Sequence, residues 1–396
     1  MQTTEVAVIG GGPAGQVCAI ALAASGVETV LVAPHARPDH RTTALMAGSI
    51  AALETLSVWP ACLPNAAPLR RIRMIDDTSR LLRAPEVTFA AEEIGLDAFG
   101  CNIENRHLVA ALEERSSALK LARVATPALA VEGDGTAVSI EYEGGALRAR
   151  LVIGADGSRS LCRAAAGIRT QQRTYPQMAL TLNLEHSRPH NDISTEFHTE
   201  SGPFTLVPLP GRRSSLVCVL APEEAQTLAA TPDEALADEV ERRAHSLLGR
   251  MRVEPGRGLF PLAVETAKII ARDRIALVGE AAHVVPPIGA QGLNLGLRDA
   301  AAIAEIVASA CRAGRDPGAP NVLARYEAAR RADIMSRTIA VDLLNRSLLA
   351  GFVPLHGLRG LSLYLAGRIG PLRRALMREG VMPAASRPRL MQGETV

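Results

Sequence analysis

The sequence predicts an α/β protein in which a Rossmann-like domain is interrupted by a second domain with an antiparallel β-sheet, followed by C-terminal helices. Three observations predict this fold. A buried strand, a glycine-rich turn and a helix open the chain. Two further buried strands, each followed by a carboxylate residue, lie far downstream at residues 150–155 and 274–278. A stretch of alternating polar and apolar residues, 177–220, separates these two strands.

The first unit runs from residue 5 to residue 33. Residues 5–9 form a β-branched run, residues 16–25 are typical of a helix of small residues, and residues 29–33 predict a second buried strand. The turn between them fits the pattern GxGxxG, whose glycines allow a tight turn, close approach of a pyrophosphate and close helix–strand packing. We therefore predict a dinucleotide-binding turn that contains Gly10, Gly12, Pro13, Ala14 and Gly15.

The residue that usually binds the ribose in such units is missing. An acidic residue is expected at the end of the second strand, but Ala33 stands there. Glu28 precedes this strand and Asp39 follows it by six residues. The ribose contact must therefore come from another part of the chain.

Two later motifs place a carboxylate at the end of a buried strand. Asp156 follows the strand 150–155, and Glu280 follows the strand 274–278. After Glu280, a turn rich in glycine and proline leads into a helix predicted over 291–311. The positive N-terminal end of such a helix would stabilise the negative charge of a reduced flavin.

The order of these segments predicts the domain organisation. We expect a nucleotide-binding domain at residues 1–172 that resumes at 266–320, and a substrate domain with an antiparallel sheet at 173–265. An amphipathic helix is predicted over 231–248 inside the substrate domain. Residues 321–382 predict a helical region with breaks near Pro354 and at 370–371, and the tail 383–396 is expected to be disordered.

Taken together, the motifs resemble those of a known family. The order GGGPAG at 10–15, GADGSRS at 154–160 and the run 279–299 resembles single-component FAD monooxygenases of the para-hydroxybenzoate hydroxylase type. Residues 41–45, 105–108 and 287–299 are most similar to the ubiquinone-biosynthesis hydroxylases of that group. The resemblance covers nearly the whole chain.

The resemblance implies an activity and a site. It implies that NAD(P)H transiently reduces bound FAD, and that O₂ then forms a flavin C4a-hydroperoxide that hydroxylates the ring of a small apolar prenylated phenol. It implies that the glycine-rich turn holds the FAD pyrophosphate and that the segment after Gly279 lies along the flavin. The residues that it assigns to the cofactor are Gly10, Gly12, Pro13, Ala14, Gly15, Arg41, Arg106, Asp156, Gly279, Glu280, Gln291, Gly292, Leu293 and Asn294.

This sequence departs from the family pattern at three places. It has Gly279-Glu280 where the family has Gly-Asp, Pro286-Pro287 where the ubiquinone group has His-Pro, and Gly289-Ala290 where that group has Ala-Gly. All three changes are compatible with FAD binding. The ring position that is hydroxylated and the length of the prenyl tail stay open.

The candidates for direct catalytic contact are His283, His198 and Tyr175. Each of them could equally be a structural residue. Two other enzymatic functions stay open, an FAD monooxygenase of secondary metabolism and an FAD-dependent prenyl reductase. A non-catalytic protein that binds FAD only for stability is a third alternative, and Ala33 and Glu280 are the residues that favour it.

Composition excludes several classes of protein. Arginine accounts for 41 of the 43 basic residues, but 41 acidic residues are interleaved with them, so no nucleic-acid-binding stripe is expected. The six cysteines have no metal-binding spacing, and we expect reduced thiols and no metal. Without a signal segment or a long apolar run, we expect a cytoplasmic protein. Peripheral association with the inner membrane or a biosynthetic complex, and a homodimer, stay open.

Overall fold

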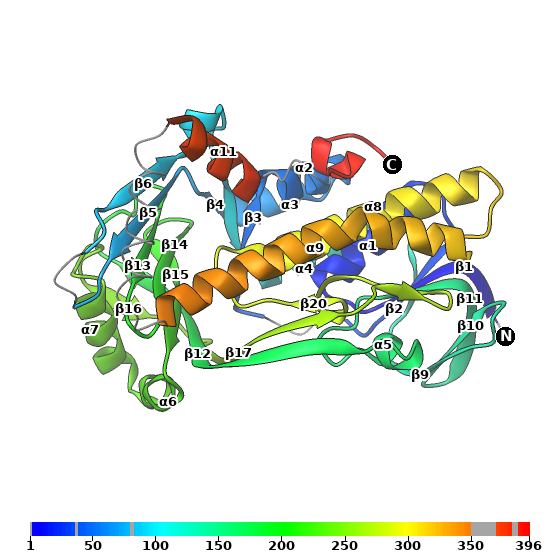
Figure 1. Cartoon of the computed structure of the whole chain (residues 1–396), viewed down its shortest axis with the longest axis horizontal. Helices are drawn as coiled ribbons and strands as arrows, with labels where there is room; N and C mark the ends of the chain where they lie inside the picture. Colours follow the sequence, from blue (N-terminus) through cyan, green and yellow to red (C-terminus); the bar gives the residue numbers. More distant parts are fainter. Residues whose placement is uncertain (1, 36–38, 80–82, 350–369, 382–386) are drawn as a thin grey trace.

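The structure is a computed structural model that describes residues 2–35, 39–79, 83–349, 370–381 and 387–396. Two large β-sheets lie at opposite ends of the molecule, and long helices run between them (Figure 1). The predicted break at Pro354 lies outside the described residues.

The first sheet has a parallel core that begins at the N-terminus. Its strand order is β18-β19-β11-β1-β2-β8, and the hairpin β9–β10 is attached to β11. Strands β19, β11, β1, β2 and β8 run parallel, whereas β18, β9 and β10 pair antiparallel. The bounds are β1 (Gln2–Ile9), β2 (Thr29–Val32), β8 (Ala122–Val124), β9 (Ala128–Gly133), β10 (Val138–Tyr142), β11 (Gly145–Gly154), β18 (Ala271–Arg272) and β19 (Ile275–Leu277).

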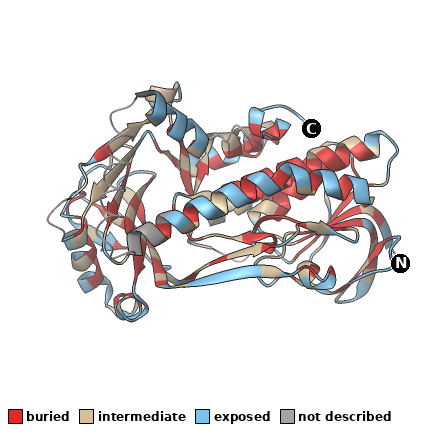
Figure 2. Cartoon of the chain, viewed as in Figure 1, coloured by how far each residue is buried: buried red, intermediate tan, exposed pale blue. Residues whose placement is uncertain are grey.

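Helices cover this sheet and form the main hydrophobic core with it. Helices α1 and α8 pack against each other, and every residue of α1 from Gly15 to Leu22 is buried. Figure 2 shows buried residues in red along α8. The small side chains of α1 allow this close packing. The bounds are α1 (Pro13–Ala24), α4 (Asn105–Ala118), α5 (Leu161–Ala165), η3 (Gly279–Ala281), α8 (Gln291–Arg312) and α9 (Pro320–Leu349).

The second sheet is antiparallel except where β5 pairs with β13. Its order is β20-β17-β12-β15-β14-β13-β5-β6, with β16 added to β12. Helices α6 and α7 cover one face and enclose a second core with it. The bounds are β5 (Arg71–Asp76), β6 (Val87–Ala90), β12 (Thr170–His186), β13 (Ile193–His198), β14 (Pro203–Leu209), β15 (Arg213–Leu220), α6 (Pro222–Ala230), α7 (Asp233–Arg243), β16 (Met251–Val253), β17 (Gly258–Ala267) and β20 (His283–Val284).

Two features of this sheet differ from the sequence-based expectation. The helix predicted over 231–248 is present but shorter, because α7 covers only residues 233–243, and α6, which precedes it, was not predicted. Pro232 separates the two helices, since its ring ends the first one. Residues 71–76 and 87–90, assigned from the sequence to the nucleotide-binding segment, supply the strands β5 and β6 at one edge of the second sheet.

A small three-stranded sheet, ordered β3-β7-β4, lies between the two large ones. Asn102 on β7 donates hydrogen bonds to the Pro208 carbonyl (2.9 Å) and to Ser215 Oγ (3.1 Å) of the second sheet. The small sheet therefore ties the two halves together. The bounds in this region are β3 (Thr42–Met46), α2 (Ala47–Thr55), α3 (Trp59–Cys62), η1 (Leu63–Asn65), β4 (Ala66–Pro68), η2 (Ala91–Ile94) and β7 (Gly100–Glu104).

The long helix α9 also connects the two halves. Near its start, the Tyr326 hydroxyl donates to the Leu277 carbonyl of the first sheet (2.7 Å). Near its end, Asn345 Nδ2 donates to Gln177 Oε1 on β12 of the second sheet (3.1 Å). No helix among the residues that the structure describes combines the length and the apolar character needed to cross a membrane.

The C-terminal end is ordered where the structure describes it. Helix α11 (Gly370–Val381) is followed at residues 389–392 by the short helix η4 (Arg389–Gln392). Leu390 and Met391 are buried, and Met391 contacts Gly48 on α2. The expectation of a disordered tail is therefore wrong for residues 387–396, because two apolar side chains anchor this segment.

Candidate functional site

The three predicted motifs meet at one edge of the first sheet. Strands β1, β11 and β19 are parallel neighbours, and Ile9, Gly154 and Leu277 stand at aligned positions at their carboxyl ends. The three turns that follow these residues therefore leave the sheet side by side. Sheets of this type bind nucleotides at this edge.

The glycine-rich turn is shaped for close approach of a ligand. Gly10 has a φ of +126°, and a Cβ there would lie 2.0 Å from the Ala155 carbonyl oxygen. A Cβ on Gly15 would lie 2.1 Å from the Gly10 carbonyl oxygen. At Gly12, by contrast, a Cβ would meet nothing within 4 Å. Gly10 and Gly15 thus allow the turn to pack closely on its neighbours, whereas the space beside Gly12 is open to a ligand.

The same turn presents the N-terminus of α1 to that open space. Gly12 is the residue before the first turn of α1, and no side chain caps the helix there. The unpaired N–H groups and the partial positive charge of the helix therefore stay available for a phosphate. This cradle fits the pyrophosphate of a dinucleotide such as FAD.

The segment after β19 packs closely on α1 and α8. Gly279 has a φ of +62°, and a Cβ on Gly296 of α8 would lie 3.0 Å from the Gly279 Cα. Gly289 and Ala290, immediately before α8, both have left-handed backbones, with φ of +66° and +54°. The departure noted at 289–290 thus places an alanine where glycine would carry less strain.

Asn294 fastens the start of α8 to β3 and α2. Its Oδ1 accepts hydrogen bonds from the Met46 amide (2.9 Å) and the Ser49 hydroxyl (2.7 Å). Its Nδ2 donates to the carbonyls of Ala44 (2.8 Å) and Ala290 (2.7 Å). The side chain is fully buried, so its role is to position the helix. The preceding residues of α8 are partly or fully exposed: Gln291, Gly292 and Leu293.

The two predicted carboxylates have different surroundings. Asp156 accepts hydrogen bonds from the Ser160 hydroxyl (2.6 Å) and the Cys162 amide (3.1 Å), so it caps α5 and holds the turn beside the glycine-rich loop. Glu280 is exposed at the sheet edge. Its carboxylate is therefore the one that can reach a cofactor without first breaking internal contacts.

Arg41 lies between the sheet edge and the second sheet. Its guanidinium donates to Asp39 (Nε to Oδ1 3.0 Å, Nη2 to Oδ2 2.8 Å) and lies over the Phe260 ring, 5.5 Å from the centroid. Burial raises the pKa of the Asp39 carboxyl, but hydrogen bonds from Arg41 and Asn105 outweigh it and lower that pKa below its ordinary value.

Arg106 is held in the same region. Its backbone amide donates to the Asp39 carbonyl (3.1 Å), and its guanidinium pairs with Glu104 (3.1 Å). Glu104 also accepts from Arg213 on β15 (3.0 Å). Both predicted arginines are therefore placed by Asp39 at the junction of the two halves, with Arg106 turned toward Glu104.

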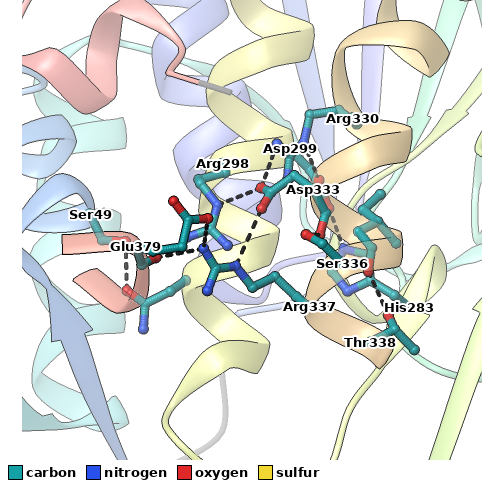
Figure 3. A network of polar contacts seen from close by, with 12 residues as sticks. Ser49, His283, Arg298, Asp299, Arg330, Asp333, Ser336, Arg337, Thr338 and Glu379 are labelled. Carbon is teal, nitrogen blue, oxygen red and sulfur yellow. Dashed lines mark hydrogen bonds and ion pairs between the residues drawn. The ribbon is translucent and has the colours of Figure 1, made fainter. Parts of the chain in front are cut away.

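Sequence reasoning missed a buried network of charges behind the site (Figure 3). Asp299 on α8 is fully buried; its Oδ2 accepts from His283 Nε2 (2.5 Å) and from the Gly279 amide (3.1 Å). Its Oδ1 accepts from Arg330 Nε (2.7 Å). Burial raises the pKa of Asp299, but His283 and Arg330 outweigh burial and lower it below the ordinary value.

The network continues through α9 to α11. Arg330 and Arg298 both donate to Asp333 Oδ2, each at 2.8 Å, and Arg337 pairs with Glu379 on α11 (2.8 Å). Asp299 falls within the run 279–299 that resembles the family, but no spacing rule pairs it with Arg330, which lies 31 positions away. In this arrangement His283 supports the Gly279 turn from behind.

The other two catalytic candidates lie on the second sheet. Tyr175 donates its hydroxyl hydrogen to Asp342 on α9. His198 Nε2 lies 2.6 Å from Glu196 Oε1, and the His198 side chain is 2% exposed. Neither residue stands at the nucleotide-binding edge.

Comparisons with known proteins agree with this geometry. Residues 3–339 match the model of the FAD binding domain family. Ubiquinone hydroxylase UbiL of Rhodospirillum rubrum is 36% identical, covering 99% of this chain and 93% of that protein. The 3-demethoxyubiquinol 3-hydroxylase of Escherichia coli is 32% identical, covering 95% and 98%.

The fold is also found among solved structures. The p-nitrophenol 4-monooxygenase PnpA of Pseudomonas putida superposes with a TM-score of 0.78 at 20% identity, covering 96% of this chain and 98% of that chain. A variant of Klebsiella pneumoniae HpxO complexed with FAD gives a TM-score of 0.76 at 19% identity, covering 96% and 99%. The chain thus belongs to the FAD binding domain family and is an FAD-dependent monooxygenase.

Proposed function

We propose that this protein hydroxylates the aromatic ring of a prenylated phenol in ubiquinone biosynthesis. The observation that carries the proposal is the 36% identity to a ubiquinone hydroxylase over 99% of the chain. A second named relative, 32% identical, hydroxylates a ubiquinol precursor according to its name. The nucleotide cradle supports the same activity, and so does the fold shared with the p-nitrophenol 4-monooxygenase PnpA.

The residues of this chain have three tasks in that reaction. The turn around Gly12 and the N-terminus of α1 bind the pyrophosphate, and the start of α8, fixed by Asn294, orients the flavin. When bound, FAD supplies electron transfer from NAD(P)H to O₂. Glu280, exposed at the sheet edge, is proposed to accept hydrogen bonds from the ribityl chain. The second sheet shields the reacting ring from water.

The proposal is tested with purified protein that retains its flavin. NADH or NADPH oxidation is measured with and without a short-chain prenylphenol, and the phenol is then analysed by mass spectrometry. We expect phenol-stimulated oxidation and a product heavier by one oxygen atom. A product heavier by two hydrogens per double bond would identify a prenyl reductase instead.

Two further outcomes separate the remaining alternatives. Stimulation by a polyketide-type phenol, with no response to prenylphenols, would favour secondary metabolism. Flavin that stays oxidised with both nicotinamide donors, with and without phenol, would favour a scaffold that binds FAD only for stability. An artificial reductant such as dithionite controls for an inaccessible flavin in that case.

We also propose peripheral attachment to the membrane that holds the substrate. Support comes from exposed apolar side chains at four-residue spacing on α9, namely Met335, Ile339 and Leu343, and on α11, Leu372 and Leu376. Sedimentation with anionic lipid vesicles tests this attachment. Loss of cosedimentation in Ile339→Glu would support it, and light scattering of the free protein would reveal a homodimer.

A further inference from the structure

One cross-strand row on the second sheet differs from its neighbours in burial. Strand register aligns Met74, Glu196, Thr205, Val217, Thr181 and Gly258 across six adjacent strands. We call these six residues the inner row. All six are partly exposed. On β12 and β15 the next positions on the same face are buried, with Ala179 and Val219 on one side and Asn183 and Ser215 on the other.

The inner row faces the nucleotide-binding half of the molecule. Asn183 donates to the His40 carbonyl (3.2 Å), and Ser215 accepts from Asn102 on β7 (3.1 Å). Asn183 and Ser215 lie two residues along their strands from Thr181 and Val217, so they share that face. The opposite face carries the side chains that pack under α6 and α7.

The inner row mixes polar and apolar residues, with Thr205 and Val217 at its centre, and carries one carboxylate, Glu196. Glu196 Oε1 lies 2.6 Å from His198 Nε2, and Thr205 Oγ1 donates to Glu196 Oε2 (3.4 Å). The Glu196 side chain is 16% exposed and that of His198 only 2%. The imidazole lies beside the carboxylate on the same face of β13 and fixes its position, while part of the Glu196 side chain stays accessible.

We propose that Glu196 binds the ring hydroxyl of the aromatic substrate, with His198 as its positioning residue. The inference rests on the proposed function and assigns the substrate contact within it. The phenol O–H donates to Glu196, and the ring lies over Thr205 and Val217, which are one and two strands away, or about 5 and 10 Å. A hydrogen bond from a phenol to a carboxylate also raises the electron density of the ring, which favours attack on an electrophilic oxygen.

The test compares a short-chain prenylphenol with its methyl ether, which cannot donate a hydrogen bond. Each ligand is titrated into the oxidised protein, and its binding is measured from the change in flavin absorbance before any reductant is added. KM and kcat are then measured for the phenol. Glu196→Gln retains an acceptor for His198 but loses the charge. We expect about tenfold weaker phenol binding and no change for the ether, because hydrogen bonds to charged groups are about twice as strong.

Two other variants complete the experiment. Glu196→Asp keeps the carboxylate and should retain most of the preference for phenol over ether. Glu185→Gln changes an exposed glutamate on β12 that pairs with Arg252 and should match the wild type. Bound FAD and thermal midpoint confirm that each variant folds.

Two failures can be told apart. Unchanged discrimination between phenol and ether in Glu196→Gln would overturn the assignment of Glu196, even if the wild type hydroxylates the phenol. A wild type that binds the phenol in preference to the ether but yields no hydroxylated product would count against the proposed function instead. The binding titration does not depend on turnover, so the assignment is tested in either case.

Discussion

Gly10 and Gly12 are two residues apart, but Gly10 is needed for packing of the turn and Gly12 for space beside the pyrophosphate. Substitution of each should therefore affect a different property, stability or FAD affinity. Gly12→Ala adds a Cβ into space with no atom within 4 Å, on a backbone with a φ of −69° that alanine accepts. We expect the apoprotein to keep its stability while FAD affinity falls at least tenfold, because the new methyl group blocks the pyrophosphate. Fluorescence titration of apoprotein with FAD measures this loss.

Gly10→Ala is the matched comparison. Its Cβ would lie 2.0 Å from a carbonyl oxygen at a φ of +126°, so the fold itself should lose about 2–4 kcal/mol. Urea unfolding of the two apoproteins gives the difference. Equal stability of both variants would contradict the division of tasks between the two glycines.

Ala290 offers a gain in stability at a single residue. Its backbone is left-handed, with a φ of +54°, which destabilises a residue with a Cβ by about 1–2 kcal/mol. Glycine would remove this strain, but it also gives the unfolded chain more conformational freedom, which offsets part of the gain. We expect Ala290→Gly to raise the free energy of unfolding by up to about 1 kcal/mol. The companion variant Gly289→Ala should lower it, and urea unfolding measures both.

At the level of elements, η4 supports the cofactor site through α2. Leu390 is 1% exposed and Met391 lies on Gly48, one residue before Ser49, which bonds to Asn294. Removal of residues 387–396 should lower the free energy of unfolding by about 2–4 kcal/mol and increase loss of FAD on dilution. Leu390→Ala should show a smaller effect in the same direction. A truncated protein that keeps its flavin and its stability would rule out this support.

The elements that local sequence specifies were predictable, and those set by distant partners were not. The strand, turn and helix at 2–24 and the helix that begins at Gln291 follow from periodicity and glycine spacing within one segment. The pairing of β5 with β13 joins residues more than 100 positions apart, and η4 is ordered by its packing on α2 and α8. At the site, the glycines carry a local pattern, whereas the salt bridge from Asp299 to Arg330 arises from packing of two helices.

For the whole molecule, buried carboxylates tie stability to pH. Burial raises the pKa of Asp333, but Arg298 and Arg330 outweigh it, so that pKa, like that of Asp299, lies below its ordinary value. Unfolded aspartate has a pKa of about 3.9. The contribution of these two carboxylates to the free energy of unfolding is therefore fully present above about pH 5. It is lost as the pH falls through the pKa values that they have in the folded protein.

Asp299→Asn tests that dependence. At neutral pH it should lower the free energy of unfolding by about 3–5 kcal/mol, because Arg330 and His283 lose the buried carboxylate that accepts their hydrogen bonds. The difference from wild type should shrink as the pH is lowered below about 4. Urea unfolding over a pH series measures it, and a difference that is constant with pH would contradict a lowered pKa for Asp299.

The contribution of residues 71–76 and 87–90 to the second sheet has a consequence for chimeric enzymes. The parallel contact of β5 with β13 means that this sheet is assembled from two separate stretches of chain. A graft that exchanges only the continuous stretch 170–267 between two relatives would leave β13 beside a foreign edge strand. Exchange of substrate preference therefore requires both stretches to be transplanted together, with the small sheet between them retained from the recipient.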